Sequence, residues 1–298
     1  MTDRWSAWLL ERRHGGDKES LRETLEFLAP IRDRVLENAG IEPGDTVLDV
    51  GCGDGLIAFG ALERVGPDGS VIFSDVSEEL LERCREIADG DPRCSFVQAE
   101  AVDLSPLADS SVDAVTMRSV LIYVADRHAA FREFRRVLGP AGRVSVFEPI
   151  NSFEYPGPDN RYGPWDVTPV RDLADRVKSV YREIHDREGN TMHDFEAPDM
   201  VAWAEDAGFE EVRLDARYQL SPSEPYESWD VYERSSANPL VPTLAEAIDS
   251  VLSPEEAARL RSHLRAKAEA GDGVQRTATA YLRAVRGAHG TADLAESG

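Results

Sequence analysis

The chain has 298 residues, of which 42% are hydrophobic, so it is long enough to bury a substantial core. Its formal net charge is −23, and a surface of that sign repels the phosphate backbone of nucleic acids and anionic lipids. No apolar run approaches the roughly 20 residues of a membrane span, and the apolar stretch at 5–10 is too short for a secretory signal. We therefore expect a cytoplasmic protein with a small-molecule partner, bound to neither nucleic acid nor membrane.

A long helical pattern comes first in the chain. Apolar residues recur at spacings of three and four from residue 11 to residue 39, which is the periodicity of one face of an α-helix. Pro30 lies inside this stretch, and we expect it to break or kink the helix, because an interior proline lacks the N–H that bonds to the preceding turn. Glycine and proline residues at 40–44 then mark the end of the pattern.

From Thr46 onward, short apolar strands alternate with helices. Strands are predicted at 46–50, 70–74, 95–98, 112–117 and 143–148, and helices at 56–65, 78–89 and 127–138. Ser77 is the expected N-cap of the second of these helices. Such alternation is typical of a parallel sheet with helices on both faces, so we predict an α/β fold.

The segment 151–194 has a different character. It is rich in proline, glycine and aromatic residues, with a short helix predicted near 170–180. Connections of this length are usually functional or disordered, and the aromatic content argues against disorder. We therefore interpret this segment as a lid or a substrate-binding segment.

The remaining elements are less regular. A helix is predicted at 198–208, a strand at 209–220, and two helices at 239–252 and 253–270, the last of them with Ser253 as N-cap. Residues 274–285 alternate between apolar and polar with threonine and tyrosine among them, which favours a strand. Their alanine, leucine and arginine content leaves a helix as the alternative.

Three closely spaced glycines follow the first predicted strand. Gly51, Gly53 and Gly55 have the spacing G-x-G-x-G, and glycine lets a ligand approach the backbone closely because it has no Cβ. Leu56 stands where a dinucleotide-binding fingerprint would carry its third glycine. The carboxylate of Asp49, inside the strand, suits a ligand with an ammonium group better than one with a pyrophosphate.

An acidic residue also ends the second predicted strand. Asp75 lies 20 residues after Gly55, and a carboxylate at that point can accept hydrogen bonds from both hydroxyls of a ribose. The alternative is a helix cap or a solvated turn residue, which the glycine loop before it disfavours. The two features together predict a site for a nucleoside with an amino group.

In order and spacing, these segments resemble the class I S-adenosylmethionine-dependent methyltransferases, above all the small-molecule methylases of the menaquinone and ubiquinone type. The resemblance implies a Rossmann-like, seven-stranded, mostly parallel sheet with an antiparallel last strand, N-terminal helices and a helical insertion or lid. It implies S-adenosylmethionine as cofactor and S-adenosylhomocysteine as product. The segments that carry it are 46–55, 74–75, 99–101, 113–124 and 138–149.

The resemblance also implies roles for single residues at the start of the fold. Asp49 and the backbone of Gly51, Cys52 and Gly53 would hold the methionine part of the cofactor. Asp75 would hold the ribose.

Further cofactor residues are implied at the ends of later strands. Val76 follows the ribose-binding acid, Glu100 would face the adenine amino group, and the amide of Ala101 would lie near the ring. Many relatives have aspartate at position 100, so the contact of Glu100 departs from the common pattern. Arg118 and Ser119 would lie beside the methionine carboxylate.

Methyl transfer from a sulfonium needs mainly alignment, which can supply about 7–11 kcal/mol, so no catalytic side chain is obligatory. A base is useful only where the acceptor must lose a proton, and the candidates are Glu148 and His193. A solvated or capping histidine is the alternative for His193. The walls of the acceptor pocket are predicted to include Tyr123, Asn151, Tyr162 and Trp165, with ordinary loop packing as the alternative.

Other function classes are less compatible with the sequence. A nicotinamide-dependent oxidoreductase should show G-x-G-x-x-G, and a nucleic-acid or glutamine methyltransferase should show an Asn/Asp-Pro-Pro-aromatic block where residues 118–123 stand here. Cys52, Cys84 and Cys94 have no metal-binding or disulfide spacing, so we predict no metal and no arsenite methylation. A protein that binds the cofactor without transferring methyl, like a cyclase, stays open.

The predicted organisation has five parts, and homodimerisation is left open. The parts are an N-terminal helical flap (1–45), the cofactor-binding core (46–150), a lid (151–196), the completion of the sheet (197–220 and 274–286) and a helical insertion (221–273).

Overall fold

The computed structural model describes residues 3–187, 189–226 and 228–288. The chain separates into two compact units, which are treated one at a time. The helical unit comprises Met1–Glu26, Ile150–Phe195 and Arg217–Ala278. The sheet unit comprises Phe27–Pro149, Glu196–Ala216 and Thr279–Gly298.

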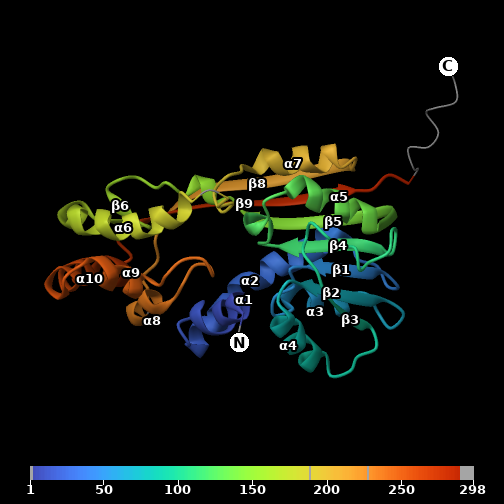
Figure 1. The fold of residues 1–298 in the computed structure, drawn as a ribbon, viewed down its shortest axis with the longest axis horizontal. Coiled ribbons are helices and arrows are strands. Elements are labelled where there is room, and N and C mark those ends of the chain that lie inside the picture. The colour runs from blue at the N-terminus through green and yellow to red at the C-terminus, as the bar shows by residue number, and fades with distance from the viewer. Residues whose placement is uncertain (1–2, 188, 227, 289–298) are drawn as a thin grey trace, which may run out of the picture. The chain divides into compact units, whose positions relative to one another are not determined.

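The sheet unit is built on a seven-stranded sheet in the order β3-β2-β1-β4-β5-β9-β8 (Figure 1). Strands β1 to β5 pair in parallel, and β9 inserts antiparallel to β5. The predicted fold class is therefore confirmed, as is the choice of a strand over a helix for the last element. The strands are β1 (Thr46–Val50), β2 (Ser70–Asp75), β3 (Cys94–Gln98), β4 (Val112–Arg118), β5 (Leu138–Pro149), β8 (Glu210–Pro222) and β9 (Val274–Val285).

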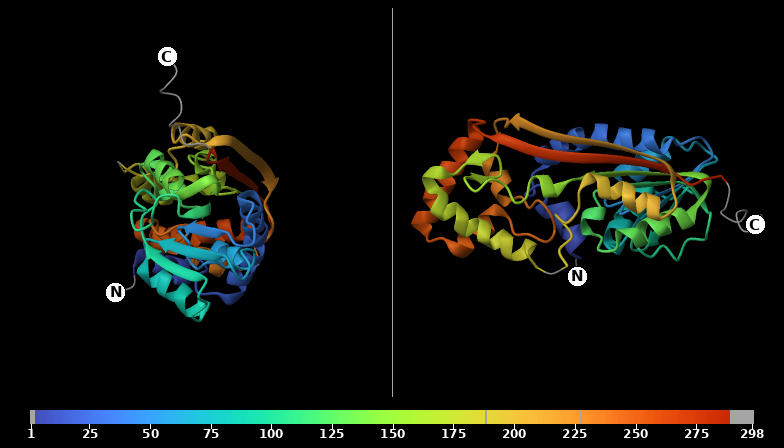
Figure 2. Two further views of the ribbon diagram at one scale, coloured as in Figure 1. Left: turned by 90° about the vertical axis from the view of Figure 1, so that its right-hand side faces the viewer. Right: turned by 90° about the horizontal axis from the view of Figure 1, so that it is seen from above.

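Helices cover both faces of this sheet. Figure 2 shows α2 (Lys18–Ala39) on one face and α5 (Arg127–Val137) and α7 (Ala197–Asp206) on the other. The central strands are mostly apolar because they are buried from both sides: Val47, Leu48 and Val115 have no exposed surface. The remaining helices of the sheet unit are α3 (Leu56–Leu62) and α4 (Glu78–Ala88). Ser77 caps α4 as predicted, with its Oγ accepting from the Leu80 amide at 3.1 Å.

The expected break at Pro30 is wrong, because α2 runs through it without interruption. Proline removes one hydrogen bond to the preceding turn, but the buried side chains of Val35, Leu36 and Ala39 secure the helix in the core. The helical pattern is interrupted earlier instead. A short helix α1 (Arg4–Ala7) continues as a single π-helical turn and ends in the turn at residues 13–16.

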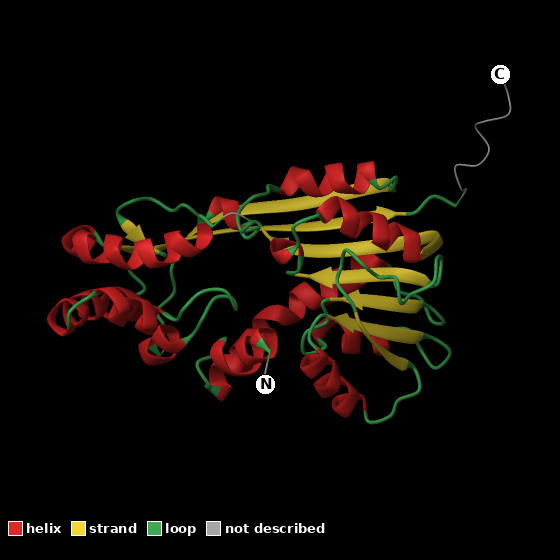
Figure 3. Ribbon diagram, in the orientation of Figure 1, coloured by secondary structure: helices red, strands yellow, loops and turns green. Residues whose placement is uncertain are grey.

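The helical unit has its own apolar core. Side chains of four helices pack around Trp165 in one buried cluster, and two short strands pair beside them (Figure 3). The helix predicted from residue 239 begins only at Leu244, because a capping box of Thr243 and Glu246 fixes its start. Ser253 caps the next helix as predicted. The elements are β6 (Arg161–Tyr162), β7 (Trp165–Asp166), α6 (Arg171–His185), α8 (Trp229–Arg234), α9 (Leu244–Val251) and α10 (Pro254–Glu269).

Candidate functional site

The turn between β1 and α3 forms the floor of the candidate site. Gly51, Gly53 and Gly55 all have positive φ, at 66°, 55° and 87°. A Cβ added to Gly51 would lie 2.4 Å from Cγ2 of Val120, so no other residue fits there without displacing the loop that follows β4. We call residues 51–55 the glycine loop. The sheet edge where it lies is the carboxyl edge of the parallel strands, where open α/β folds bind ligands.

Asp49 carries a buried carboxylate beside this loop. Its side chain is only 1% exposed, and Oδ1 accepts a hydrogen bond from the Thr116 hydroxyl at 2.8 Å. Oδ2 is buried without a hydrogen-bond partner. Burial raises the pKa of the Asp49 carboxyl to about 7. A buried oxygen without a donor is costly unless a ligand supplies one, and a ligand ammonium has the matching charge.

Asp75 connects the end of β2 to the glycine loop. Its Oδ2 accepts from the Gly53 amide and its Oδ1 from the Ser77 amide, both at 2.9 Å. These bonds fix the carboxylate at the sheet edge beside the loop. Val76, which follows, is half-exposed, and its carbonyl accepts a bond from the Gln98 side chain.

Cys52 lies inside the glycine loop and is buried. The neighbouring Cys84 thiol and the burial of the group raise the pKa of Cys52 well above its usual value. A thiol in that state stays protonated at neutral pH and is a poor nucleophile. Cys52 therefore contributes its backbone to the loop. Its amide donates to the Ser74 carbonyl at 2.9 Å.

The segment after β3 carries Glu100 and Ala101. The Glu100 side chain is exposed and Ala101 is buried. The Ala99 amide donates to the Asp75 carbonyl at 3.1 Å, which places this segment beside the end of β2. Glu100 is therefore available to a ligand that lies over the edge of the sheet.

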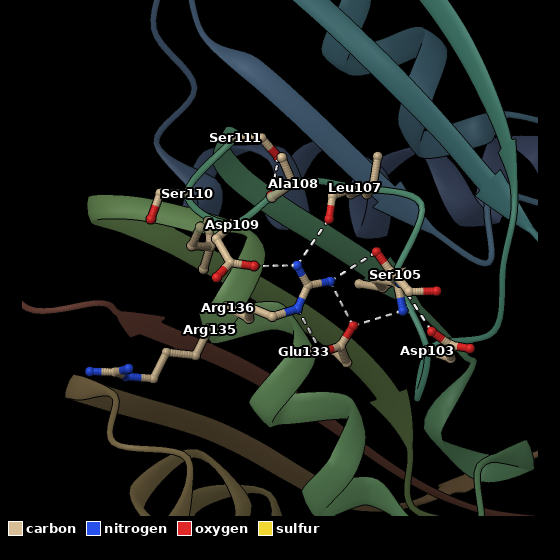
Figure 4. A network of polar contacts seen from close by, with 12 residues as sticks. Asp103, Ser105, Leu107, Ala108, Asp109, Ser110, Ser111, Glu133, Arg135 and Arg136 are labelled. Carbon is tan, nitrogen blue, oxygen red and sulfur yellow. Dashed lines mark hydrogen bonds and ion pairs between the residues drawn. The ribbon is translucent and has the colours of Figure 1, made fainter.

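A network around Arg136 on α5 secures the rest of that segment (Figure 4). The guanidinium donates to the carbonyls of Leu104 and Leu107, both at 2.9 Å, and to the Asp109 carboxylate at 2.7 Å. Glu133 bonds to Arg136 and accepts from the Leu104 amide at 2.8 Å. No local sequence signal pointed to this network, because Arg136 resembles any other arginine near the end of a helix.

The end of β4 forms the third side of the site. Ser119 has a φ of 57°, unusual for a residue other than glycine, and its amide donates to the Phe147 carbonyl of β5 at 2.9 Å. The positive charge of Arg118 lowers the pKa of Asp49 and of Glu148, against the larger effect of their burial. Tyr123 ends the short 3-10 turn that follows and is partly exposed.

Glu148 ends β5 and has no exposed surface. Its Oε1 accepts from the amides of Val120 and Leu121, at 2.8 and 2.9 Å. Its Oε2 is buried without a hydrogen-bond partner. Burial raises the pKa of the Glu148 carboxyl to about 7.

The other predicted site residues lie in the helical unit. The His193 ring packs on those of Tyr155 and His185, with centroids 4.5 and 4.4 Å away, and burial, with His185 next in effect, lowers its pKa to about 4. The Asn151 side chain donates to the Met192 carbonyl at 3.1 Å. Tyr162 packs against the core of this unit. Trp165 is 0% exposed within that core, so it cannot contact a ligand at the protein surface.

Two contributors to the cofactor side of the site were not predicted. Thr116 faces Asp49 across the β1–β4 register, and the parallel pairing of these strands could have pointed to it. Val120 contacts the glycine loop from the turn after β4, and no local sequence signal marks it.

Within the described residues, no group of three or more His, Cys, Asp or Glu is placed to hold a metal ion. No helix among them combines the length and apolar character needed to cross a bilayer.

Comparison with known proteins agrees with this geometry. Residues 48–146 match a family model described as a methyltransferase domain. Nocamycin O-methyltransferase of Saccharothrix syringae is 33% identical over 198 residues, which cover 63% of this chain and 68% of that protein. The 2-phytyl-1,4-naphtoquinone methyltransferase of Trichormus variabilis is 36% identical over 39% of this chain and 52% of its own length.

A putative sarcosine dimethylglycine methyltransferase from Galdieria sulphuraria has the same fold, with a TM-score of 0.51 at 17% identity, covering 96% of this chain and 99% of that one. Several curated relatives are matched over only 30–52% of their length. The shared part includes the glycine loop, Asp75 and the strands that carry them. The chain belongs to the class I S-adenosylmethionine-dependent methyltransferases.

Proposed function

We propose that the protein transfers a methyl group from S-adenosylmethionine to an oxygen, nitrogen or carbon nucleophile of a small molecule, leaving S-adenosylhomocysteine. The observation that carries the proposal is the buried Oδ2 of Asp49, which has no hydrogen-bond partner among the residues that the structure describes and lies beside the glycine loop. The α-ammonium of the cofactor's methionine part supplies such a donor with a compensating charge. When bound, the cofactor provides a methyl group on a positively charged sulfur.

The other cofactor contacts follow the carboxyl edge of the sheet. Asp49 and the backbone of Gly51, Cys52 and Gly53 would hold the methionine part, and Asp75 would accept from the ribose hydroxyls. The carboxylate of Asp75 is already fixed by two backbone amides, so it is preorganised for this role.

The adenine and carboxylate contacts extend from this set. Glu100, with the Ala101 amide, would bind the adenine, and Val76 would lie between adenine and ribose. Arg118 and Ser119 would hold the methionine carboxylate, since both lie at the end of β4.

Catalysis would rest on alignment, which by itself can supply about 7–11 kcal/mol. His193 is the candidate base where the acceptor must lose a proton, because its lowered pKa keeps the imidazole neutral at pH 7. The same low pKa makes it a weak base, so it suits an acidic acceptor such as a phenol or an enol. Tyr123, Asn151 and Tyr162 remain candidate acceptor contacts, whereas the burial of Trp165 removes it from that set.

A small-molecule acceptor is supported by charge and by the relatives. The net charge of −23 disfavours nucleic acid, and the relatives carry names of enzymes that methylate an O-nucleophile or a quinone ring. A cytoplasmic location stays a prediction, as does a homodimer. Light scattering after size-exclusion chromatography would show whether the protein is a dimer.

Isothermal titration with S-adenosylmethionine and, separately, NADH tests cofactor identity. We expect binding of S-adenosylmethionine only, and a much weaker affinity for it in Asp49→Asn, which keeps the shape of the side chain without its charge. Binding of NADH alone would refute the proposal. Release of S-adenosylhomocysteine with a panel of phenols, amines and quinones then tests turnover; binding without release from any of them would favour a cyclase-like protein.

A further inference from the structure

Glu148 lies at the point where the loop after β4 meets the end of β5. Backbone amides of the loop bond to this end of β5: Ser119 donates to the Phe147 carbonyl, and Val120 and Leu121 donate to Glu148 Oε1. The last two amides open the 3-10 turn Leu121–Tyr123 and have no partner within that turn. One carboxylate oxygen therefore fixes the direction in which the chain leaves β4.

That direction determines how closely Val120 approaches the glycine loop. Its Cγ2 lies 2.4 Å from the place that a Cβ on Gly51 would occupy, so the isopropyl group directly covers the Gly51 backbone. Ser119, held at a φ of 57°, turns the chain so that Val120 follows it into this contact. Glu148 therefore holds Val120 by a hydrogen bond, and Val120 packs on the Gly51 backbone, which would hold the methionine part of the cofactor.

The burial of Glu148 argues against direct chemistry. A base must come within hydrogen-bond reach of the proton it removes, and this side chain has no exposed surface. Its Oε1 is already engaged by the amides of Val120 and Leu121, so that oxygen is not free to take a proton from an acceptor.

We propose that Glu148 is a positioning residue, which sets the cofactor affinity of the glycine loop through Val120 and is not the base of the reaction. The inference rests on the proposed function, because it concerns S-adenosylmethionine binding at that loop. The inference goes beyond the proposed function because it assigns an effect on cofactor affinity to a side chain that touches neither cofactor nor acceptor.

Three single variants, a control and a double variant test the proposal by titration calorimetry and steady-state kinetics. Glu148→Ala leaves two buried amides without an acceptor, and we expect the Kd and KM for S-adenosylmethionine to rise by about tenfold, with a smaller change in kcat. Glu148→Gln keeps an Oε1 that can accept from both amides, so the rise should stay below about threefold. Val120→Ala should raise the Kd while leaving the carboxylate bonds intact.

The matched control is Ser145→Ala on the same strand. Ser145 is equally buried and its hydroxyl donates to the Val35 carbonyl of α2 at 2.8 Å, away from the glycine loop. This variant should lower the melting temperature without changing the Kd. In the double variant of Glu148→Ala and Val120→Ala, the Kd should be close to that of Glu148→Ala alone, because both changes act on one contact.

The outcomes separate the alternatives. If both Glu148 variants lose kcat while their Kd for S-adenosylmethionine stays that of the wild type, Glu148 is a base and the inference is wrong. If the effects of Glu148→Ala and Val120→Ala on the Kd add in the double variant, Glu148 does not act through Val120 and the inference is wrong. If Glu148→Ala does not fold, Glu148→Gln and Val120→Ala still give the comparison. A wild-type protein that binds no S-adenosylmethionine would instead refute the proposed function.

Discussion

Single carboxylates decide how the proposed cofactor site responds to pH. Burial raises the pKa of Asp49 to about 7 in the protein without ligand. A cationic partner at Oδ2 favours the ionised form, so cofactor binding releases a proton wherever Asp49 was protonated before. The affinity should therefore be greatest above the pKa and fall as the pH drops through it.

The first prediction follows from that sign. The affinity for S-adenosylmethionine should be about half of its limiting value at pH 7 and weaken by up to about tenfold for each further pH unit below it. Titration calorimetry from pH 5.5 to 7.5 measures this. Glu148 has a pKa in the same range, so Asp49→Asn is the necessary comparison: it should bind weakly with little dependence on pH. A flat profile for the wild-type protein would contradict the role of Asp49.

A second prediction concerns Asp75. Its replacement by alanine removes the proposed acceptor for the ribose hydroxyls and leaves the Gly53 and Ser77 amides without their carboxylate. We expect a loss of about 1–3 kcal/mol in cofactor binding. Asp68→Ala, which removes an exposed acid from the same unit, should leave binding unchanged. Equal affinity of both variants would rule out the ribose assignment.

Local spacing predicted the residues of the glycine loop and the two aspartates beside it, because their positions within a few residues of a strand end carry the signal. Thr116 and Val120 were not predicted as parts of the site, because their partners lie far away in the sequence: the Thr116–Asp49 hydrogen bond spans 67 positions. Such contacts depend on strand register, which a single sequence does not reveal. The roles of all these residues toward a ligand stay predictions.

At the scale of elements, α5 secures the segment that follows β3, whose first residues are the proposed adenine contacts. Arg136 holds the segment between β3 and β4 by bonds to two carbonyls and to the Asp109 carboxylate, and it also pairs with Glu133 of its own helix. Arg136→Ala should lower the stability of the fold by about 2 kcal/mol and raise the Kd for S-adenosylmethionine.

Thermal unfolding and titration measure both effects of this third prediction. Arg136→Lys should not restore them, because an ammonium cannot reproduce the planar fork of a guanidinium. Arg132→Ala on the same helix is the control, as that side chain is 61% exposed and its guanidinium lies 3.9 Å from the Asp126 carboxylate. A full rescue by lysine would show that charge alone secures the segment.

Element boundaries were predicted where capping chemistry is local and missed where packing decides. The N-caps Ser77 and Ser253 were identified from sequence, because a hydroxyl three residues before a free amide is a local feature. Pro30 was misjudged, since its effect depends on how strongly the rest of α2 is buried. The strand β9 was recognised from its alternation, although its composition also suits a helix.

At the scale of the whole molecule, all proposed cofactor contacts fall in the sheet unit. We therefore predict that S-adenosylmethionine alone slows amide hydrogen exchange at the carboxyl ends of β1, β2 and β4, while α10 of the helical unit is unaffected. The comparison of exchange with and without cofactor checks this, and Asp49→Asn at the same concentration is the control. Protection of α10 would show that the helical unit also responds to the cofactor.

The place of β9 has a consequence for how the chain is made. This strand lies between β5 and β8, yet it is the last of the seven to leave the ribosome. Until residues 274–285 have been synthesised, β8 has no neighbour in the sheet, and its apolar residues and open backbone remain available to other chains. A ribosome that stalls before residue 274 would therefore release a chain prone to aggregate, and a chaperone has most to protect in the interval between the synthesis of β8 and that of β9.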